Sequence, residues 1–215
     1  MKSFLIRIIT MLIGLMLFAL GIILTIRANI GNPPWEVFHA GLVAVTGITL
    51  GTATIITGFV VVIIVTLMGE KFGIGTIGSM VLTGIFMDII ILLDFIPTAQ
   101  SFVAGLVTML VGMFILALGS YFYMKSAFGV GPRDNLMVVL ARKTKLPVGL
   151  CRGMVEAFVA IIGWLLGGPL GVGTLIAAVA IGFCVQITFL LLRFDVTAVK
   201  HETLRETFAS FKKKI

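Results

Sequence analysis

Residues 14–34 read GLMLFALGIILTIRANIGNPP, and residues 112–132 read GMFILALGSYFYMKSAFGVGP. The two stretches share glycines, an Ala-Leu-Gly triplet and a closing proline, always at positions that differ by 98. The same offset aligns the chain with itself without a gap from Ile8 to Phe95. An internal repeat of this length decides the architecture before any single motif does. The chain is therefore expected to consist of two copies of one unit.

The composition indicates a polytopic membrane protein. Hydrophobic residues make up 60% of the chain and charged residues 12%, about half the charged share of soluble domains. The apolar runs of about 20 residues are long enough to cross a hydrocarbon core of ~30 Å as helices. Six such segments are predicted, at residues 4–27, 51–68, 73–93, 102–125, 149–166 and 171–193.

Each copy also contains a short segment that opens with proline. Pro33-Pro34-Trp35-Glu36 begins one that runs to about residue 45, and Pro132-Arg133-Asp134-Asn135 begins its equivalent, which runs to about residue 142. Proline with an acidic residue close behind is typical of the first turn of a helix. Because roughly 12 residues cannot span a bilayer, these helices are predicted to lie at the interface or to dip in as re-entrant helices.

The basic residues predict the orientation. With six spans and a cytoplasmic N-terminus, 14 of the 16 Lys and Arg residues fall on the cytoplasmic side; Arg27 falls outside and Arg152 lies within a span. Both termini are therefore expected in the cytoplasm. The net charge of +7 is then a membrane topology signal, and no nucleic-acid partner is expected.

Three spans per copy force the second copy to enter the membrane upside down. The predicted fold class is thus an all-α polytopic membrane protein with six transmembrane helices in two inverted three-helix repeats, each with a short proline-initiated helix after its first span. The expected boundaries are 1–98 and 99–195 for the repeats. Residues 196–215 form a basic tail, either an amphipathic helix on the inner leaflet or a solvated segment.

The starts of the two short helices hold the first candidate site residues. Glu36 and Asp134 occupy equivalent positions, His39 follows Glu36 by one turn, and Arg133 precedes Asp134. The acids either cap their own helices or face a central cavity, where they could bind protons, cations or an amine.

The remaining candidates lie inside the long segments. Arg152 and Glu156 are one helical turn apart, either as a binding pair or as a closed structural ion pair. Asp88 and its equivalent Gln186 are polar residues among Ile, Leu and Val. Asp88 needs a partner, for which Arg27, His39 or Thr54 are available.

No catalytic or metal-binding set is recognisable in the sequence, and no cofactor is expected. Cys151 and Cys184 are interpreted as small core residues, and Trp35 and Trp164 as anchors at the membrane interface. An intramembrane enzyme would need Glu36, His39 and Asp88 around one metal ion or scissile bond, so the chain is expected not to be an enzyme.

Together the motifs resemble a bacterial family, the YczE/YyaS/YitT-type integral membrane proteins, and its YczE-like branch in particular. The resemblance implies a multi-pass protein of the bacterial plasma membrane, and it implies no substrate. The motifs that carry it are Gly31-Asn32-Pro33-Pro34-Trp35-Glu36-Val37-Phe38-His39, Thr46 to Thr52, Gly73-Ile74-Gly75-Thr76, Gly129 to Asp134, Glu156, Gly163 to Gly168, Gly171-Val172-Gly173-Thr174 and Gln186.

The leading functional hypothesis is a secondary transporter or channel-like carrier of a small polar or anionic molecule, bound between the repeats. Arg133 and Arg152 would attract an anionic group, and Glu156 or Asp88 would carry a coupling proton. The alternative is a substrate-binding subunit of the energy-coupling type, or an accessory protein without transport of its own. A homo-oligomer or a partner membrane complex fits either hypothesis.

Overall fold

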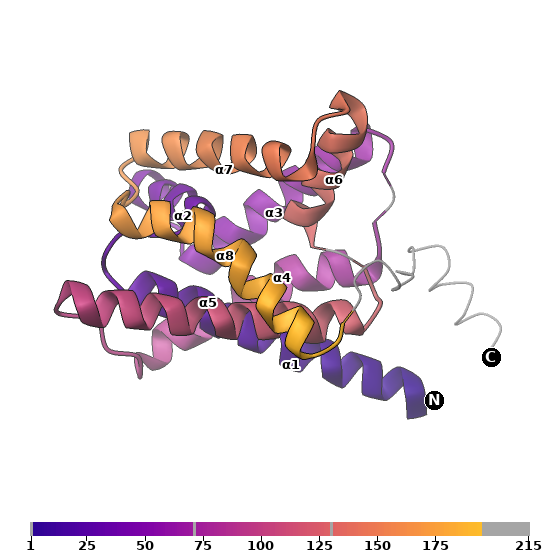
Figure 1. Ribbon diagram of the computed structural model, residues 1–215, viewed down its shortest axis with the longest axis horizontal. Helices are drawn as coiled ribbons and strands as arrows, with labels where there is room; N and C mark the ends of the chain where they lie inside the picture. Colours follow the sequence, from indigo (N-terminus) through magenta and orange to yellow (C-terminus); the bar gives the residue numbers. More distant parts are fainter. Residues whose placement is uncertain (1, 71, 130, 195–215) are drawn as a thin grey trace.

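A computed structural model describes residues 2–70, 72–129 and 131–194, and every regular element in that part of the chain is an α-helix. The predicted tail at 196–215 lies outside the described residues. Figure 1 labels the helices in chain order. They are α1 (Lys2–Arg27), α2 (Pro34–Thr46), α3 (Leu50–Leu67), α4 (Ile74–Leu93), α5 (Phe102–Lys125), α6 (Pro132–Thr144), α7 (Val148–Leu165) and α8 (Val172–Leu191).

The order of long and short helices agrees with the sequence prediction. Helices α2 and α6 have 13 residues each and begin at Pro34 and Pro132, in the first-turn position that proline favours. Among the described residues, α1, α3, α4, α5 and α8 are long and apolar enough to cross a bilayer. The chain is therefore a multi-pass membrane protein. A sixth span at α7, which has 18 residues and carries Arg152 and Glu156, stays a prediction.

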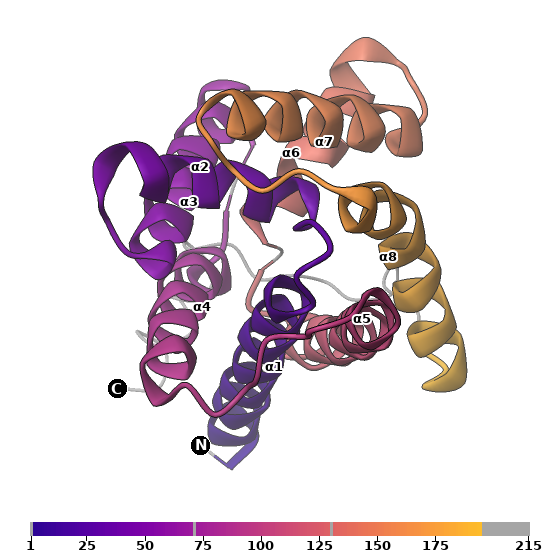
Figure 2. The same cartoon turned by 90° about the vertical axis from the view of Figure 1, so that its left-hand side faces the viewer.

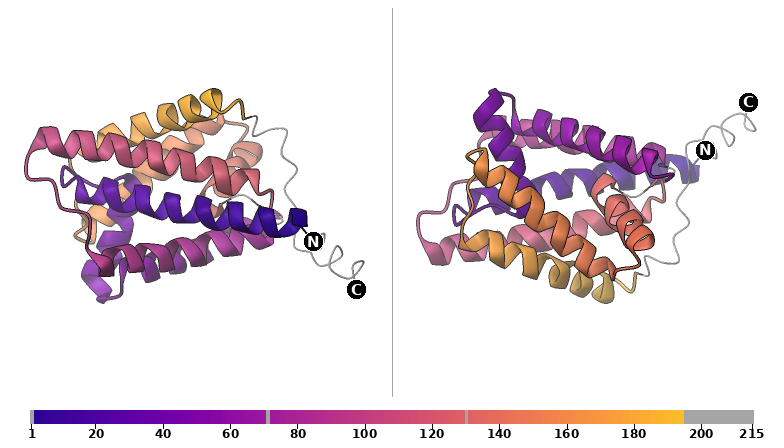
Figure 3. Two further views of the ribbon diagram at one scale, coloured as in Figure 1. Left: turned by 90° about the horizontal axis from the view of Figure 1, so that it is seen from below. Right: turned by 90° about the horizontal axis from the view of Figure 1, so that it is seen from above.

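Helices α1 and α5 run antiparallel in close contact (Figure 3), because four glycines remove the side chains between them. A methyl group on Gly21 would lie 2.7 Å from the carbonyl oxygen of Gly112, and one on Gly112 would lie 2.9 Å from that of Gly21. Gly14 and Gly119 face each other in the same way. Small residues that let two backbones approach are a common basis of helix packing in membranes.

Contacts between the two copies come in matched pairs. The backbone N–H of Gly75 donates to the carbonyl of Phe128 at 2.9 Å, and the N–H of Gly173 donates to the carbonyl of Ile30 at 2.7 Å. Gly173 and Phe128 lie 98 positions after Gly75 and Ile30, so each copy makes the same bond to the other. In the described part of the chain, each half therefore donates the same backbone hydrogen bond to the other half.

The remaining helices surround this pair. Figure 2 shows α7 on the side of the molecule opposite α1, with α3 and α8 to either side. Helix α1 packs on α4 and, equivalently, α5 packs on α8. The next pair of equivalent helices, α3–α4 and α7–α8, does not pack in the same way. Helix α3 packs along α4, whereas α7 packs against α2 and makes at most marginal contact with α8.

Two ion pairs mark the ends of the bundle. Arg27 pairs with Asp94 at the end where α1 stops, and Arg142 pairs with Glu70 at the opposite end, where the N-terminus lies. Both pairs include a largely exposed side chain. Arg27 thus has a partner other than Asp88, for which the sequence suggested it.

Candidate functional site

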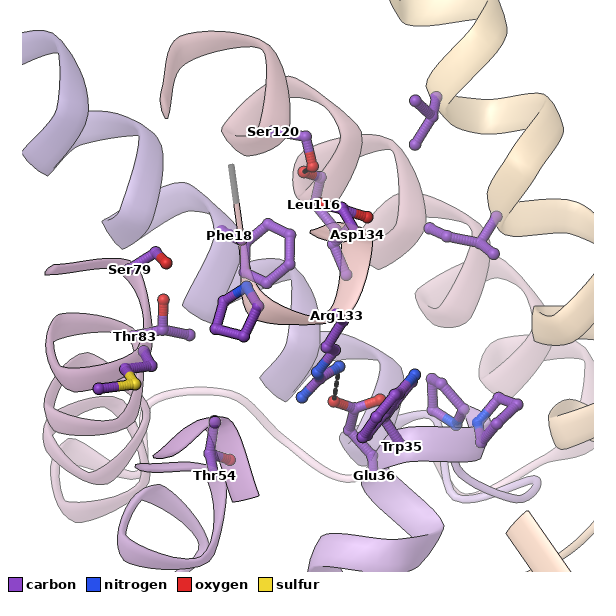
Figure 4. A pocket seen from close by; sticks show the side chains of 18 of the residues that line it. Phe18, Trp35, Glu36, Thr54, Ser79, Thr83, Leu116, Ser120, Arg133 and Asp134 are labelled. Atoms are coloured by element: carbon purple, nitrogen blue, oxygen red, sulfur yellow. Dashed lines mark hydrogen bonds and ion pairs between the residues drawn. The ribbon is translucent and has the colours of Figure 1, made fainter. Parts of the chain in front are cut away.

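A cavity of about 180 Å³ lies inside the bundle, and residues from all eight described helices contribute to its wall (Figure 4). Its apolar lining includes Phe18, Met80 and Met113. The volume is below the ~300–1,000 Å³ of sites for drug-sized ligands, which limits an occupant to a small molecule. The charged and hydroxyl-bearing lining residues are Thr25, Glu36, Thr54, Thr57, Ser79, Thr83, Ser120, Tyr123, Arg133, Asp134, Arg152 and Glu156.

The first turns of α2 and α6 meet in this cavity. Nη1 of Arg133 lies 3.2 Å from Oε1 of Glu36, the contact drawn as a dashed line in Figure 4. The guanidinium carbon of Arg133 lies 4.8 Å from the centroid of the Trp35 ring, within the range of a cation–π contact. Glu36 is only 4% exposed. The cation that pairs with this buried carboxylate, Arg133, comes from the other copy.

His39 lies behind Glu36 and does not belong to the cavity wall. Its Nδ1 is 3.9 Å from Oε1 of Glu36 and 3.2 Å from Oγ1 of Thr54, and its side chain is fully buried. The hydrogen bond of Nδ1 is therefore made with Thr54, because 3.9 Å is too long for a hydrogen bond to Glu36. Within the described residues its Nε2 has no hydrogen-bond partner.

The Arg152–Glu156 pair belongs to the cavity wall. Nε of Arg152 donates to Oε1 of Glu156 at 2.8 Å within α7, as the spacing of four predicts. Glu156 is 6% exposed, whereas the Arg152 side chain is 37% exposed. The pair is closed, and it lies where an occupant of the cavity would meet it.

Asp134 is the third acid in the wall, and it differs from the other two. The hydroxyl of Tyr123 donates to its Oδ2 at 2.9 Å. Among the described residues no Lys, Arg or His forms an ion pair with it. Tyr123 was not predicted as a site residue, and no local motif marks it in the apolar sequence of α5.

Asp88 and Gln186 lie outside the cavity wall. Asp88 binds the start of α3, where Thr49 Oγ1 donates to it at 2.6 Å and the N–H of Gly51 at 2.8 Å. The partners suggested by the sequence, Arg27, His39 and Thr54, are wrong for this residue, because the free N–H group of a helix start lies closer. Gln186 is exposed on α8.

Trp35 corrects a second expectation. It is 6% exposed and forms part of the cavity wall, so it is not an anchor at the membrane interface. The stacked Arg133 and the neighbouring Glu36 explain why it is held inside. Trp164, by contrast, is 57% exposed. Within the described residues, Trp35 Nε1 and Thr57 Oγ1 are buried in the wall without hydrogen-bond partners.

No group of three or more His, Cys, Asp or Glu residues in the described part of the chain could hold a metal ion. Cys151 and Cys184 are buried free thiols, and Cys184 packs in an apolar cluster with Ala117 and Ala177.

Comparisons with known proteins show which family the chain resembles. The family model of DUF6198, a family of unknown function, matches residues 5–189. The chain is 32% identical over 185 residues to the uncharacterized membrane protein YczE of Bacillus subtilis (strain 168), which covers 85% of this chain and 81% of the relative. An uncharacterized protein of Haemophilus influenzae is 29% identical, with 81% of both chains covered. YyaS of B. subtilis is 25% identical over 81% of this chain and 88% of the relative. No solved structure matches the chain.

Proposed function

Since the chain belongs to the DUF6198 family and is similar to the membrane protein YczE, we propose that it is a secondary carrier whose solute binds in the central cavity. The observation that carries the proposal is the meeting of two charged helix starts, one from each copy, in a cavity to which every described helix contributes. Charged groups at membrane depth are costly unless paired or used, which makes such a cluster a candidate for binding.

The matched contacts support an inverted repeat with six spans. The equivalent bonds from Gly75 to Phe128 and from Gly173 to Ile30 are those expected of two copies related by an axis in the membrane plane. Helix α7 is then the span equivalent to α3. Solute sites of inverted-repeat carriers lie between the copies near the membrane midplane, at helices that do not cross it. In this chain, α2 and α6 are the short helices that would form the solute site.

The proposed orientation places the N-terminal end of the bundle in the cytoplasm. Arg7, Lys125, Arg142 and Lys145 lie in the segments that begin or stop at this end, and Arg27 lies at the other. This distribution is the one that the positive-inside rule favours.

The charges of the wall favour a solute that carries a positive group. Arg133 is paired with Glu36 and Arg152 with Glu156, so the charge of each guanidinium is already balanced by a carboxylate. Within the described part of the chain, the Asp134 carboxylate has no cation as an ion-pair partner. The unpartnered groups of Trp35 and Thr57 add a hydrogen-bond donor and a hydroxyl. A small protonated amine with one hydrogen-bond acceptor would satisfy all three.

A binding subunit or an accessory membrane protein is the second candidate. It is favoured by the closed state of both arginine–glutamate pairs, which a purely structural role also requires. A structural role predicts that no small solute binds.

Thermal stabilisation of the purified protein tests the proposal, because a ligand that binds only the folded state raises its apparent stability. Small amines, neutral polyols and carboxylates are compared on the natural chain, on Asp134→Asn and on Asp94→Asn, a carboxylate outside the cavity. The proposal expects amines to stabilise the natural chain and Asp94→Asn, and not Asp134→Asn. Stabilisation by carboxylates alone would refute the assigned charge. No stabilisation by any solute would favour the accessory protein.

A further inference from the structure

The packing of α3 against α4, here called the first seam, depends on two glycines and one acid. A methyl group on Gly84 would lie 2.5 Å from the carbonyl oxygen of Gly51, so the two backbones are in direct contact. One turn beyond Gly84, Asp88 accepts hydrogen bonds from Thr49 and Gly51 at the start of α3. The first seam is therefore closed by backbone contact and by a helix cap.

The equivalent pair, α7 and α8, is called the second seam, and it is open. Gly149 and Gly182 are the equivalents of Gly51 and Gly84, yet a methyl group on either would meet nothing within 4 Å. Gln186, the equivalent of Asp88, is exposed and makes no hydrogen bond within the described residues. The two glycines that close the first seam are thus present in the second, without the contacts.

The second seam borders the cavity. Arg152 and Glu156 on α7 and Ile181 and Val185 on α8 all belong to its wall. Arg152 lies about one turn from Gly149 and retains substantial exposure. An opening between α7 and α8 would therefore give access to the buried charges, from the N-terminal end of the bundle.

We propose that the second seam is a gate of the cavity, which closes by adopting the arrangement of the first seam. In the closed form the backbone of Gly149 packs on Gly182, and the side-chain oxygen of Gln186 accepts the N–H of Gly149. The inference rests on the proposed carrier function, since a gate needs a cavity that takes up a solute. Beyond that function, the inference names the residues that control access of a solute to the cavity.

The chemistry of the two caps explains why this seam is the open one. Asp88 is a carboxylate that accepts two hydrogen bonds, from the hydroxyl of Thr49 and from the N–H of Gly51. Gln186 is a neutral amide, and position 147, equivalent to 49, is a proline without a hydroxyl. Charge-assisted hydrogen bonds are roughly twice as strong as neutral ones. The second seam therefore closes less tightly than the first.

Disulfide cross-linking in native membranes tests the gate without any solute. Cys151→Ala/Cys184→Ala serves as the background, and Pro147→Cys/Gln186→Cys reports closure of the second seam. Thr49→Cys/Asp88→Cys is the equivalent pair in the first seam. The expected result is cross-linking of both pairs, with that of the second pair reduced at least several-fold by an added Gly182→Leu. Ile187→Leu, at an exposed position of α8 roughly 140° around the helix from Gly182, is the control and leaves the cross-linking unchanged.

Two outcomes would overturn the gate. If the first pair cross-links and the second never does, the second seam is permanently open. If Gly182→Leu does not reduce cross-linking of the second pair, the helices approach without the glycine contact. Failure of the carrier function is distinguishable, because it leaves the cross-linking as expected while no solute stabilises the protein.

Discussion

The guanidinium of Arg133 stacks on the indole of Trp35, and the two residues occupy equivalent positions of the two copies. The starts of α2 and α6 therefore meet directly in the cavity. At this meeting point one copy contributes a cation, and the other contributes the aromatic ring and the acid Glu36 that hold it. The two helix starts are equivalent in sequence position and complementary in chemistry, which ties the two short helices to each other.

Removal of Arg133 is predicted to destabilise the fold through Glu36. Arg133→Gln leaves a 4%-exposed carboxylate without its cation, and breaking a buried pair in this way typically costs about 3–5 kcal/mol. The double variant Arg133→Gln/Glu36→Gln is expected to recover part of the loss. Denaturant unfolding in detergent measures both. Arg142→Gln, which removes the largely exposed partner of Glu70, is the control and should cost about 1 kcal/mol or less.

The cap at the first seam gives a comparison between equivalent residues. Asp88→Ala removes the acceptor of two hydrogen bonds at the start of α3, and a loss of about 1–3 kcal/mol in unfolding free energy is expected. Gln186→Ala removes an exposed side chain and should stay within about 0.5 kcal/mol of the natural chain. Equal losses for the two variants would contradict the open second seam.

The glycine contact between α1 and α5 predicts that one Gly→Ala substitution lowers the unfolding free energy, whereas another, outside the contact, raises it. Gly21→Ala inserts a methyl group against the backbone of α5 and should cost about 1–3 kcal/mol, as overpacking does. Gly153→Ala adds a methyl group in open space, where alanine's helix propensity should stabilise by up to about 1 kcal/mol. Thermal unfolding of both variants decides the matter. Destabilisation of Gly153→Ala by as much as Gly21→Ala would show that the glycines do not act through this contact.

Much of this architecture was predictable because it depends on spacing. The offset of 98 residues placed Pro34 and Pro132 at equivalent helix starts, and the apolar runs located the long helices to within a few residues. The family resemblance drawn from the motifs is confirmed by the DUF6198 match. Glu36 and Asp134 were found as site candidates because acids near a helix start are recognisable in sequence, and Arg133 was found because it precedes Asp134.

The rest depends on contacts that no spacing reveals. Trp35 was misplaced because tryptophan usually prefers the interface, and its stacking requires position 133 to come alongside. Tyr123 enters the site only because α5 passes the start of α6. The open second seam was not predictable from the glycines, because Gly149 and Gly182 repeat the pattern of Gly51 and Gly84. The cap residues of the two seams differ in sequence, but only the contacts show that this difference accompanies an open seam.

Transfer of the first cap to the second seam is predicted to close the gate. Pro147→Thr/Gln186→Asp reproduces the Thr49 and Asp88 pair at equivalent positions. A carboxylate that gains charge-assisted hydrogen bonds adds about 1.5–3 kcal/mol to the closed form, which shifts the equilibrium roughly tenfold or more. Ile181→Cys, in the background without the natural cysteines, reports access to the cavity through its rate of maleimide labelling. The transferred cap should slow this labelling about tenfold, while a cysteine at the exposed Leu191 should label at an unchanged rate. Unchanged labelling at position 181, with the double variant still folded, would mean that the cap chemistry does not control the second seam.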